Sequence, residues 1–238
     1  MPPLFIDTAE LAAFGAQWTA NGQKLSRSRP YSSMQLGELF DQAVGEALAE
    51  LLGGIPIVRP TSTHLQPTQR DCVEVGPVRV VGGVRPQNFD VGYRPDGVRV
   101  AFDSKTLNDR QSVGKNYQNM INDIATEATT VHSRFPYAVV AFLVAIPAPC
   151  LVHPQSQALI GTLERLGRRT LVDEPEHLAE AISLVIWDPE TGEVSPDVPA
   201  EDSPLRVERF STLVEAAYVG RYKGLPPHAT DIDSEATS

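Results

Sequence analysis

A chain of 238 residues with 42% hydrophobic and 21% charged residues is long enough for one large domain and has the composition of a soluble globular protein. The longest apolar run, residues 138–148, is too short for a membrane span and is broken by Pro147, so no membrane partner is expected. The formal net charge of −10 argues against a uniformly basic, nucleic-acid-binding surface.

Basic residues nevertheless gather in one part of this acidic chain. Residues 79–115 carry seven basic residues against four acids, whereas residues 173–208 carry Arg206 against eleven acids. A basic face suited to nucleic acid is therefore compatible with the net charge, although an ordinary solvated surface would give the same counts. The seven basic residues are Arg79, Arg85, Arg94, Arg99, Lys105, Arg110 and Lys115.

The clearest predicted helix covers residues 32–52. Its apolar residues follow a period of 3.6, Ser32 or Ser33 can cap its start, and Gly53-Gly54 ends it. Residues 55–76 are expected to form a loop because prolines and threonines are frequent there. Three strands are predicted next, at residues 78–81, 89–94 and 98–104.

The second half of the chain continues with alternating helices and strands. A polar-faced helix is predicted over residues 116–132, and the apolar run at 137–146 is typical of a fully buried strand. This order of elements indicates an α/β layer architecture. The remaining elements are predicted as helices at 155–166, 176–181 and 207–223, a strand at 182–187, an exposed loop at 190–204 and a disordered tail at 226–238.

The stretch FDVGYRPDGVRVAFDSK, residues 89–105, has the pattern of a β-hairpin with a two-residue turn at Asp96-Gly97. In that register Asp90 lies directly opposite Asp103, with their Cβ atoms about 5 Å apart on one face of the sheet. Lys105, two residues beyond Asp103, leaves from the same face. The residues expected to point into an apolar layer on the other face are Val91, Tyr93, Val100 and Phe102.

Two directly opposed carboxylates destabilise a hairpin unless something neutralises them. A Mg²⁺ ion would do so, because it takes oxygen ligands and shares its other positions with water and phosphate oxygens. With the Lys105 ammonium beside them, Asp90 and Asp103 would form a site suited to hydrolysing a phosphodiester. The structural alternative is that Asp103 and Lys105 pair on an exposed strand while Asp90 caps a loop.

These residues resemble the motif of the PD-(D/E)XK nuclease superfamily, which has an aspartate on one strand, a variable spacer and (D/E)-x-K on the next. Here the pattern is Asp90, twelve residues and Asp103-Ser104-Lys105, with Phe89 where the family often has proline. The resemblance implies a restriction-endonuclease-like core of a helix, a three-stranded meander, a helix and a buried strand, over about residues 32–146. It implies that Asp90 and Asp103 bind Mg²⁺, or Mn²⁺ as a substitute, and that Lys105 positions the attacking water. The chain would be one nuclease domain, residues 1–238, with C-terminal additions at 147–225 and the tail at 226–238.

The segment GELFDQAVGEALAELLGG is similar to the family's G-x-x-x-(E) helix, which adds a further catalytic acid. The match places Asp41 at that position, with Glu46 as the second candidate. Helical spacing puts Asp41, Glu46 and Glu50 at the edges of the apolar stripe and points Glu38 away from it. The alternative is that these acids are simply the solvated side of an amphipathic helix.

Chain size and the polar helix KNYQNMINDIATEA look like those of type II restriction endonucleases. Side chains on this helix are suited to contacting base edges or phosphates of double-stranded DNA, although an ordinary exposed helix would have the same polarity. Because one site cuts one strand, we expect a homodimer. The candidate DNA-binding residues are Arg110, Lys115, Asn116, Gln118, Asn119 and Asn122.

Other chemistries lack their motifs. The five histidines show no HxH or HExxH spacing, and no Walker A, GxGxxG or GxSxG motif occurs, which argues against a histidine zinc site, nucleotide-driven translocation and a serine hydrolase. Cys72 and Cys150 lie far apart and outside any CxxC, so we expect no disulfide framework and a reduced, cytoplasmic compartment. The N-terminal residues lack the pattern of a secretion signal.

The sequence thus predicts a Mg²⁺-dependent endodeoxyribonuclease, in particular a sequence-specific type II restriction enzyme. One alternative is a structure-specific repair or junction-resolving nuclease with the same core. The other is a non-catalytic DNA-binding subunit that keeps the fold. Retention of Asp90, Asp103 and Lys105 together argues against the last alternative, because an inactive site has no need of opposed carboxylates.

Overall fold

A six-stranded mixed sheet forms the centre of the molecule in the computed structural model, which describes all residues except 29, 62, 68, 152–154, 224 and 226–238. The strands lie side by side in the order of the sequence. β2, β3 and β4 form an antiparallel meander, whereas β1 with β2, β4 with β5 and β5 with β6 are parallel pairs. The strands are β1 (Ile57–Val58), β2 (Val73–Val81), β3 (Pro86–Tyr93), β4 (Val100–Thr106), β5 (Val139–Pro147) and β6 (Ala181–Trp187).

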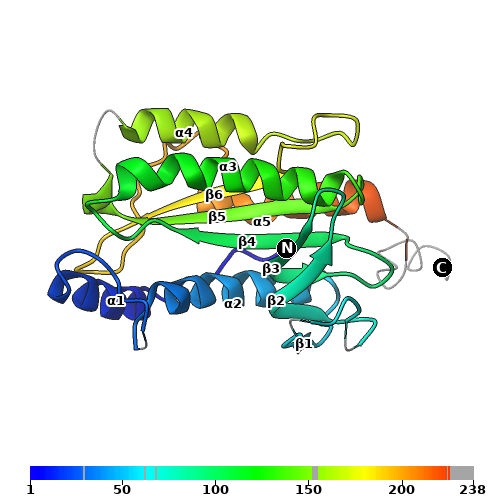
Figure 1. Cartoon of the computed structure of the whole chain (residues 1–238), viewed down its shortest axis with the longest axis horizontal. Helices are drawn as coiled ribbons and strands as arrows, with labels where there is room; N and C mark the ends of the chain where they lie inside the picture. Colours follow the sequence, from blue (N-terminus) through cyan, green and yellow to red (C-terminus); the bar gives the residue numbers. More distant parts are fainter. Residues whose placement is uncertain (29, 62, 68, 152–154, 224, 226–238) are drawn as a thin grey trace, which may run out of the picture.

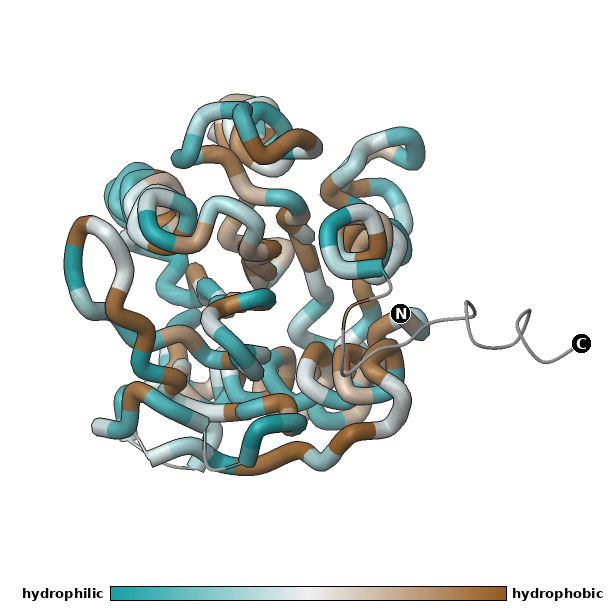
Figure 2. Tube along the Cα trace, turned by 90° about the vertical axis from the view of Figure 1, so that its right-hand side faces the viewer, coloured by the Kyte–Doolittle hydropathy of each residue, from teal (hydrophilic) through white to brown (hydrophobic). Residues whose placement is uncertain are grey.

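Helices cover both faces of this sheet (Figure 1). α3 and α4 pack together on one face, while α2 packs on the meander and α5 on β5 and β6 from the other. Figure 2 views the helices nearly end-on and shows hydrophilic and hydrophobic residues on each, as expected for helices with one buried face. The helices are α1 (Thr8–Ala20), α2 (Ser33–Leu51), α3 (Val113–His132), α4 (Gln155–Leu166) and α5 (Val207–Tyr222), with a short 3₁₀ helix at Ala148–Cys150.

The α/β class expected from the sequence is confirmed, and the clearest predicted elements are close to those observed. α2 begins after Ser32, whose hydroxyl accepts from Gln35 N–H in a capping box. All nine residues of β5 are buried between its two parallel neighbours, as its apolar run predicts. One hydrophobic cluster extends from Leu11 to Tyr218 across both faces of the sheet. None of the helices described is long and apolar enough to cross a bilayer.

Several predicted boundaries were wrong. Residues 176–181 do not form a helix, because Ala179 pairs with the backbone of Leu166 and Arg169 and the chain then enters β6. The loop predicted at 55–76 contains β1 and the start of β2. α1 was not predicted, and the tail predicted at 226–238 lies outside the described residues.

The connection between β3 and β4 is longer than the predicted two-residue turn. The ladder ends at Tyr93 and Val100, and the six residues between them form a loop in which Arg99 N–H donates to Tyr93 O at 2.9 Å. The reason is that two loop arginines turn inward instead of pairing across the strands. Arg94 forms a buried ion pair with Glu74, and the buried Arg99 pairs with Asp96, whose carboxylate is exposed. The predicted basic face therefore loses Arg94 and Arg99.

A buried ionic network ties α3, α5 and the loop after α4 to the start of β5. The Glu180 carboxylate is fully buried and lies 2.7 Å from Arg169 Nη1, 2.8 Å from Arg221 Nη2 and 3.3 Å from His132 Nε2. It also accepts from Val140 N–H at 2.7 Å. Burial alone would raise the pKa of Glu180, but these partners outweigh burial and hold the pKa below its ordinary value.

We expect Glu180→Gln to lower the free energy of unfolding at pH 7 by about 3–5 kcal/mol, because it leaves buried cations without their counter-charge. Since the folded-state pKa of Glu180 is depressed, its contribution is present above the unfolded pKa of about 4.3 and is lost as the pH falls through the folded value. Urea unfolding of wild type and variant from pH 7 to pH 3 should show the difference shrinking at low pH. The exposed Glu190→Gln is the control and should change stability little at either pH.

Candidate active site

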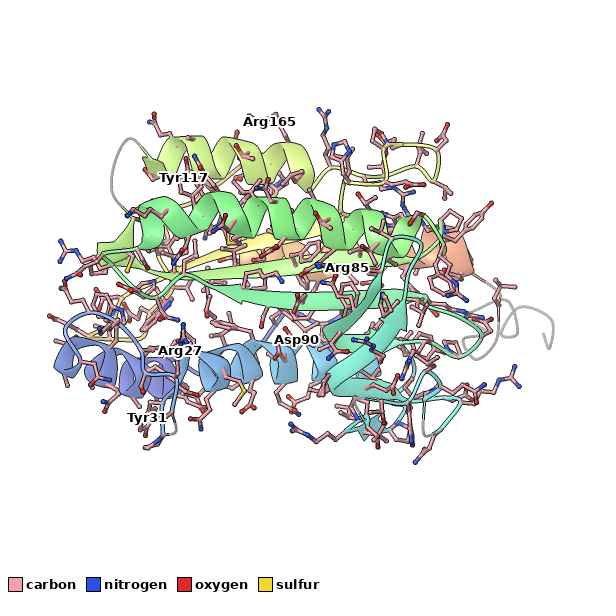
Figure 3. All side chains as sticks on the ribbon, viewed as in Figure 1. Arg27, Tyr31, Arg85, Asp90, Tyr117 and Arg165 are labelled. Carbon is pink, nitrogen blue, oxygen red and sulfur yellow. The ribbon has the colours of Figure 1, made fainter. Side chains whose placement is uncertain are left out.

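Asp90 and Asp103 lie where the β3–β4 ladder ends. The observed pairs Val91–Phe102 and Gly92–Ala101 have the predicted register, and its continuation places Asp90 opposite Asp103. Asp90 Oδ2 accepts from Ser104 N–H at 2.9 Å and from Ser104 Oγ at 3.3 Å, so its carboxylate is held against β4. Figure 3 shows Asp90 beside α2, near the middle of the molecule.

The negative charge of the Asp103 carboxylate is disfavoured in this arrangement. It is 7% exposed, and its pKa is raised well above the ordinary value. Burial is the largest cause, followed by the contact with Asp90 and its negative charge, while the Lys105 ammonium opposes the shift. Two carboxylates in contact in this setting favour either a shared proton or a bound cation.

Helix α2 brings a third carboxylate to the same place because glycines let it approach the sheet closely. A Cβ on Gly37 would lie 3.0 Å from Ser104 Oγ, and one on Gly45 would lie 2.3 Å from a methyl carbon of Val75. Asp41, one turn after Gly37, is buried, and its Oδ1 has no hydrogen-bond partner among the described residues. Burial, and to a smaller extent repulsion by Asp90, raise the pKa of Asp41 to about 8. A hydrogen bond with Ser104 opposes this shift.

Lys105 is held by two acids. Its Nζ forms an ion pair with Asp103 and a second with Glu127 Oε1 at 2.8 Å. Burial alone would lower the pKa of Lys105, but these two carboxylates outweigh burial and hold the pKa above its ordinary value. Lys105 therefore remains an ammonium group over the physiological pH range.

Sequence analysis missed Glu127, which reaches the site from α3. It is buried on the apolar stripe of that helix, three residues after Ile124 and seven after Met120. An acid at a position where the helical period requires an apolar side chain was the available signal. The partner of Glu127 could not be read from the same pattern, because Lys105 is 22 residues away.

The carboxylates open into a cleft of about 740 Å³ between α2 and the meander. Asp41, Asp90 and Asp103 line it, and Ser104 forms part of its wall. Arg59, from the segment that follows β1, lines the same cleft and is exposed. With Glu38, the cleft therefore combines four acids with one accessible guanidinium group.

Two assignments on α2 need correction. Glu46 does not line this cleft: it is exposed, accepts a hydrogen bond from Gln42 and lines a different depression next to α1. Glu38, which helical spacing was expected to point away, lines the carboxylate cleft, and its charge adds to the raised pKa of Asp41. The difference arises because β2–β4 contact α2 along the Gly37–Asp41 side.

The predicted DNA-binding residues are not brought to the cleft. Five of them lie exposed on α3, and Arg110 precedes that helix and donates to Gln23 Oε1 at 2.7 Å. Asn116 donates to Ser112 Oγ at 2.9 Å. The five residues on α3 are Lys115, Asn116, Gln118, Asn119 and Asn122.

The carboxylate donors of this cleft are of the kind that a hard divalent cation takes, although no group of three or more His, Cys, Asp or Glu within the described residues is placed so that it could hold a metal ion. The buried, unpartnered Asp41 Oδ1 and the raised pKa values of Asp41 and Asp103 are the observations that indicate this fit. Mg²⁺ is often bound through one or two carboxylates and keeps several water ligands, so a complete protein cage is not required.

Comparisons of the chain with protein-family models, with curated proteins and with solved structures found no match. The chemical assignment of the cleft therefore depends on its own residues.

If the cleft is catalytic, we expect Glu127→Gln to lower its kcat about tenfold, because Lys105 loses one of two charge-assisted partners, each worth about 1.5–3 kcal/mol. Substrate affinity should not change, so the effect should appear in kcat and not in the substrate Kd. The matched control is Asp123→Asn, an exposed acid on the same helix, which should leave kcat at the wild-type value. Equal loss of turnover in both variants would contradict the role of Glu127.

Proposed function

We propose that the carboxylate cleft hydrolyses phosphodiester bonds of double-stranded DNA with Mg²⁺ as its cofactor. The observation that carries this proposal is the convergence of Asp41, Asp90 and Asp103 in one cleft, with Lys105 paired to Asp103. A pairing of ordinary surface residues does not explain a buried Asp41 with a pKa of about 8. The order of α2, the β2–β4 meander, α3 and β5 also supports the resemblance to a restriction-endonuclease-like core.

Each residue of the cleft has a role in this proposal. Asp90 and Asp103 hold the cation, and Asp41 offers its unpartnered oxygen to the same site. Mg²⁺, when bound, supplies positive charge that offsets the charge of the phosphate. Lys105 keeps its proton, so it positions the attacking water and stabilises negative charge at the phosphate and does not act as a general base.

We further propose that the chain acts as a homodimeric, sequence-specific type II restriction enzyme in the cytoplasm. Two copies would place one cleft on each strand of a duplex. The two cysteines are free and buried, which suits a reduced compartment, and burial raises the pKa of Cys150 to about 12, which makes it a poor nucleophile.

The direct test of this function is incubation of the purified protein with plasmid DNA and Mg²⁺, followed by mapping of the ends. Discrete fragments with a common end sequence support the restriction enzyme. Cutting confined to branched substrates would instead select the junction-resolving nuclease, and a smear would mean a nuclease without sequence preference. Intact plasmid in Mg²⁺ and in Mn²⁺ would leave the non-catalytic DNA-binding subunit.

Arg59 is the cleft residue suited to a phosphate contact. Duplex affinity measured in Ca²⁺ should fall as salt rises, since each phosphate contact releases counterions. Arg59→Gln should weaken binding about tenfold and lower the slope of log K against log salt by about one. Arg165→Gln, on α4 in the upper layer of Figure 3, removes the same charge elsewhere and should leave both quantities unchanged. An unchanged slope in Arg59→Gln would exclude this contact.

A further inference from the structure

A second pocket of about 650 Å³ lies beside the loop that joins β3 and β4. Its walls come from the end of β2, from that loop, from the segment around Leu65 and from the residues that follow α3. It shares no lining residue with the carboxylate cleft. Its volume is within the range of about 300–1,000 Å³ that is usual for small-ligand sites.

Three arginines line this pocket, and of these only Arg70 also lowers the pKa of a carboxylate in it, that of Asp96. Arg79 donates to Asn88 Oδ1 at 3.2 Å and Arg134 to Val81 O at 2.8 Å, so neutral acceptors hold both. Arg70 is exposed. None of the three arginines forms an ion pair within the described part of the chain. Three arginines that line one pocket create a local positive potential in a chain of net charge −10.

The remaining charges of the pocket are already neutralised. Arg94, at its base, is paired with Glu74 and also donates to Leu65 O at 2.8 Å. Asp96 is paired with Arg99, whose hydrogen bonds are the main reason that the pKa of Asp96 lies below its ordinary value. The net charge presented to a ligand is therefore that of Arg70, Arg79 and Arg134.

The other walls are apolar and include an aromatic ring. Leu65 is 58% exposed, and Pro95, Val98 and Phe135 also line the pocket, with the Arg134 guanidinium carbon 5.4 Å from the centroid of the Phe135 ring. A ligand that matches both sets of walls carries an anionic group and a flat or apolar body. Guanidinium groups bind phosphate oxygens in a bidentate manner, and aromatic rings stack on nucleobases.

We infer that this pocket binds a nucleoside phosphate, with the phosphate on the three arginines and the base against Phe135 and the neighbouring apolar side chains. The site does not require the cleft to be a nuclease. Asp90 and Arg94 are four residues apart on one chain, at most about 13 Å at the rise of a strand. The phosphate could therefore belong to a free nucleotide or to a strand that also passes the cleft.

The test is isothermal titration of the full chain in EDTA, so that no metal occupies the cleft. The probes are a deoxynucleoside monophosphate, the same deoxynucleoside without phosphate, inorganic phosphate, and a single-stranded oligonucleotide without terminal phosphates. We expect the monophosphate to bind at least tenfold more tightly than the nucleoside or inorganic phosphate. Tighter binding of the oligonucleotide than of the monophosphate would identify a strand as the source of the phosphate. Tighter binding of the monophosphate would identify a free nucleotide.

Variants locate the binding. Arg70→Gln, Arg79→Gln and Arg134→Gln should each weaken binding of the preferred probe about tenfold. Arg70 is exposed, so Arg70→Gln should not impair folding. Arg165→Gln should bind as wild type, and because EDTA keeps the cleft free of metal, failure of the cleft chemistry would not affect this result. Wild-type affinity in Arg70→Gln and Arg134→Gln, or equal affinity for inorganic phosphate and the monophosphate, would overturn the assignment.

Discussion

Asp103→Asn is expected to abolish Mg²⁺-dependent cleavage while leaving duplex affinity in Ca²⁺ near the wild-type value. The substitution keeps the size of the side chain but removes the charge that a cation requires. It also removes the repulsion with Asp90 and the buried negative charge that raise the pKa of Asp103. The variant without metal should therefore unfold at a higher denaturant concentration than wild type at pH 8, where repulsion between the ionised carboxylates is largest.

The measurements are single-turnover cleavage, duplex anisotropy and denaturant unfolding on the same preparation. Asp90→Asn should lose cleavage in the same way, and Glu46→Gln is the matched control because Glu46 lies on α2 but outside the cleft. Cleavage by Asp103→Asn at the wild-type rate would end the assignment of the cleft.

Lys105→Ala is expected to lower single-turnover cleavage by about 10²–10³-fold, the usual loss when one group that stabilises transition-state charge is removed. DNA affinity should change little, because Asp103 and Glu127 already neutralise the Lys105 ammonium before the transition-state charge develops. Lys105→Arg should restore little activity, since a planar guanidinium group does not replace a compact ammonium between two carboxylates. If Lys105 only pairs on the surface of the sheet, Lys105→Ala would cost at most about 1 kcal/mol of stability and no activity. A fully active Lys105→Ala enzyme would therefore exclude the catalytic role.

The parts of the site that depend on local pattern were predictable. The hairpin register, which was predicted from a turn at Asp96-Gly97, was correct even though the turn was wrong, because side-chain period and burial specify register independently of the loop. The helical period, Ser32 and the glycines predicted α2, and Gly37 with Asp41 followed from the family resemblance.

The parts of the fold and site that depend on tertiary contacts could not be predicted from the sequence. Arg94 and Arg99 were counted as a basic face because charged residues are usually exposed. Arg94 is instead held inside by the buried Glu74, and Arg99 is buried against the Tyr222 ring while it pairs with the exposed Asp96. The segment 176–181 has helix-forming residues, but the buried network around Glu180 and the pairing of Ala179 determine its conformation. α1 did carry a signal, since Leu11, Phe14 and Trp18 follow helical spacing after the capping Asp7.

The proposed function requires that the carboxylates of this cleft bind a divalent cation. The most direct test is a calorimetric titration of Mn²⁺ into the wild-type protein and into Asp103→Asn. We predict saturable binding to the wild-type chain that is lost or weakened at least tenfold in Asp103→Asn and unchanged in Glu46→Gln. Equal binding by wild type and Asp103→Asn, or no saturable binding by wild type, would contradict the claim.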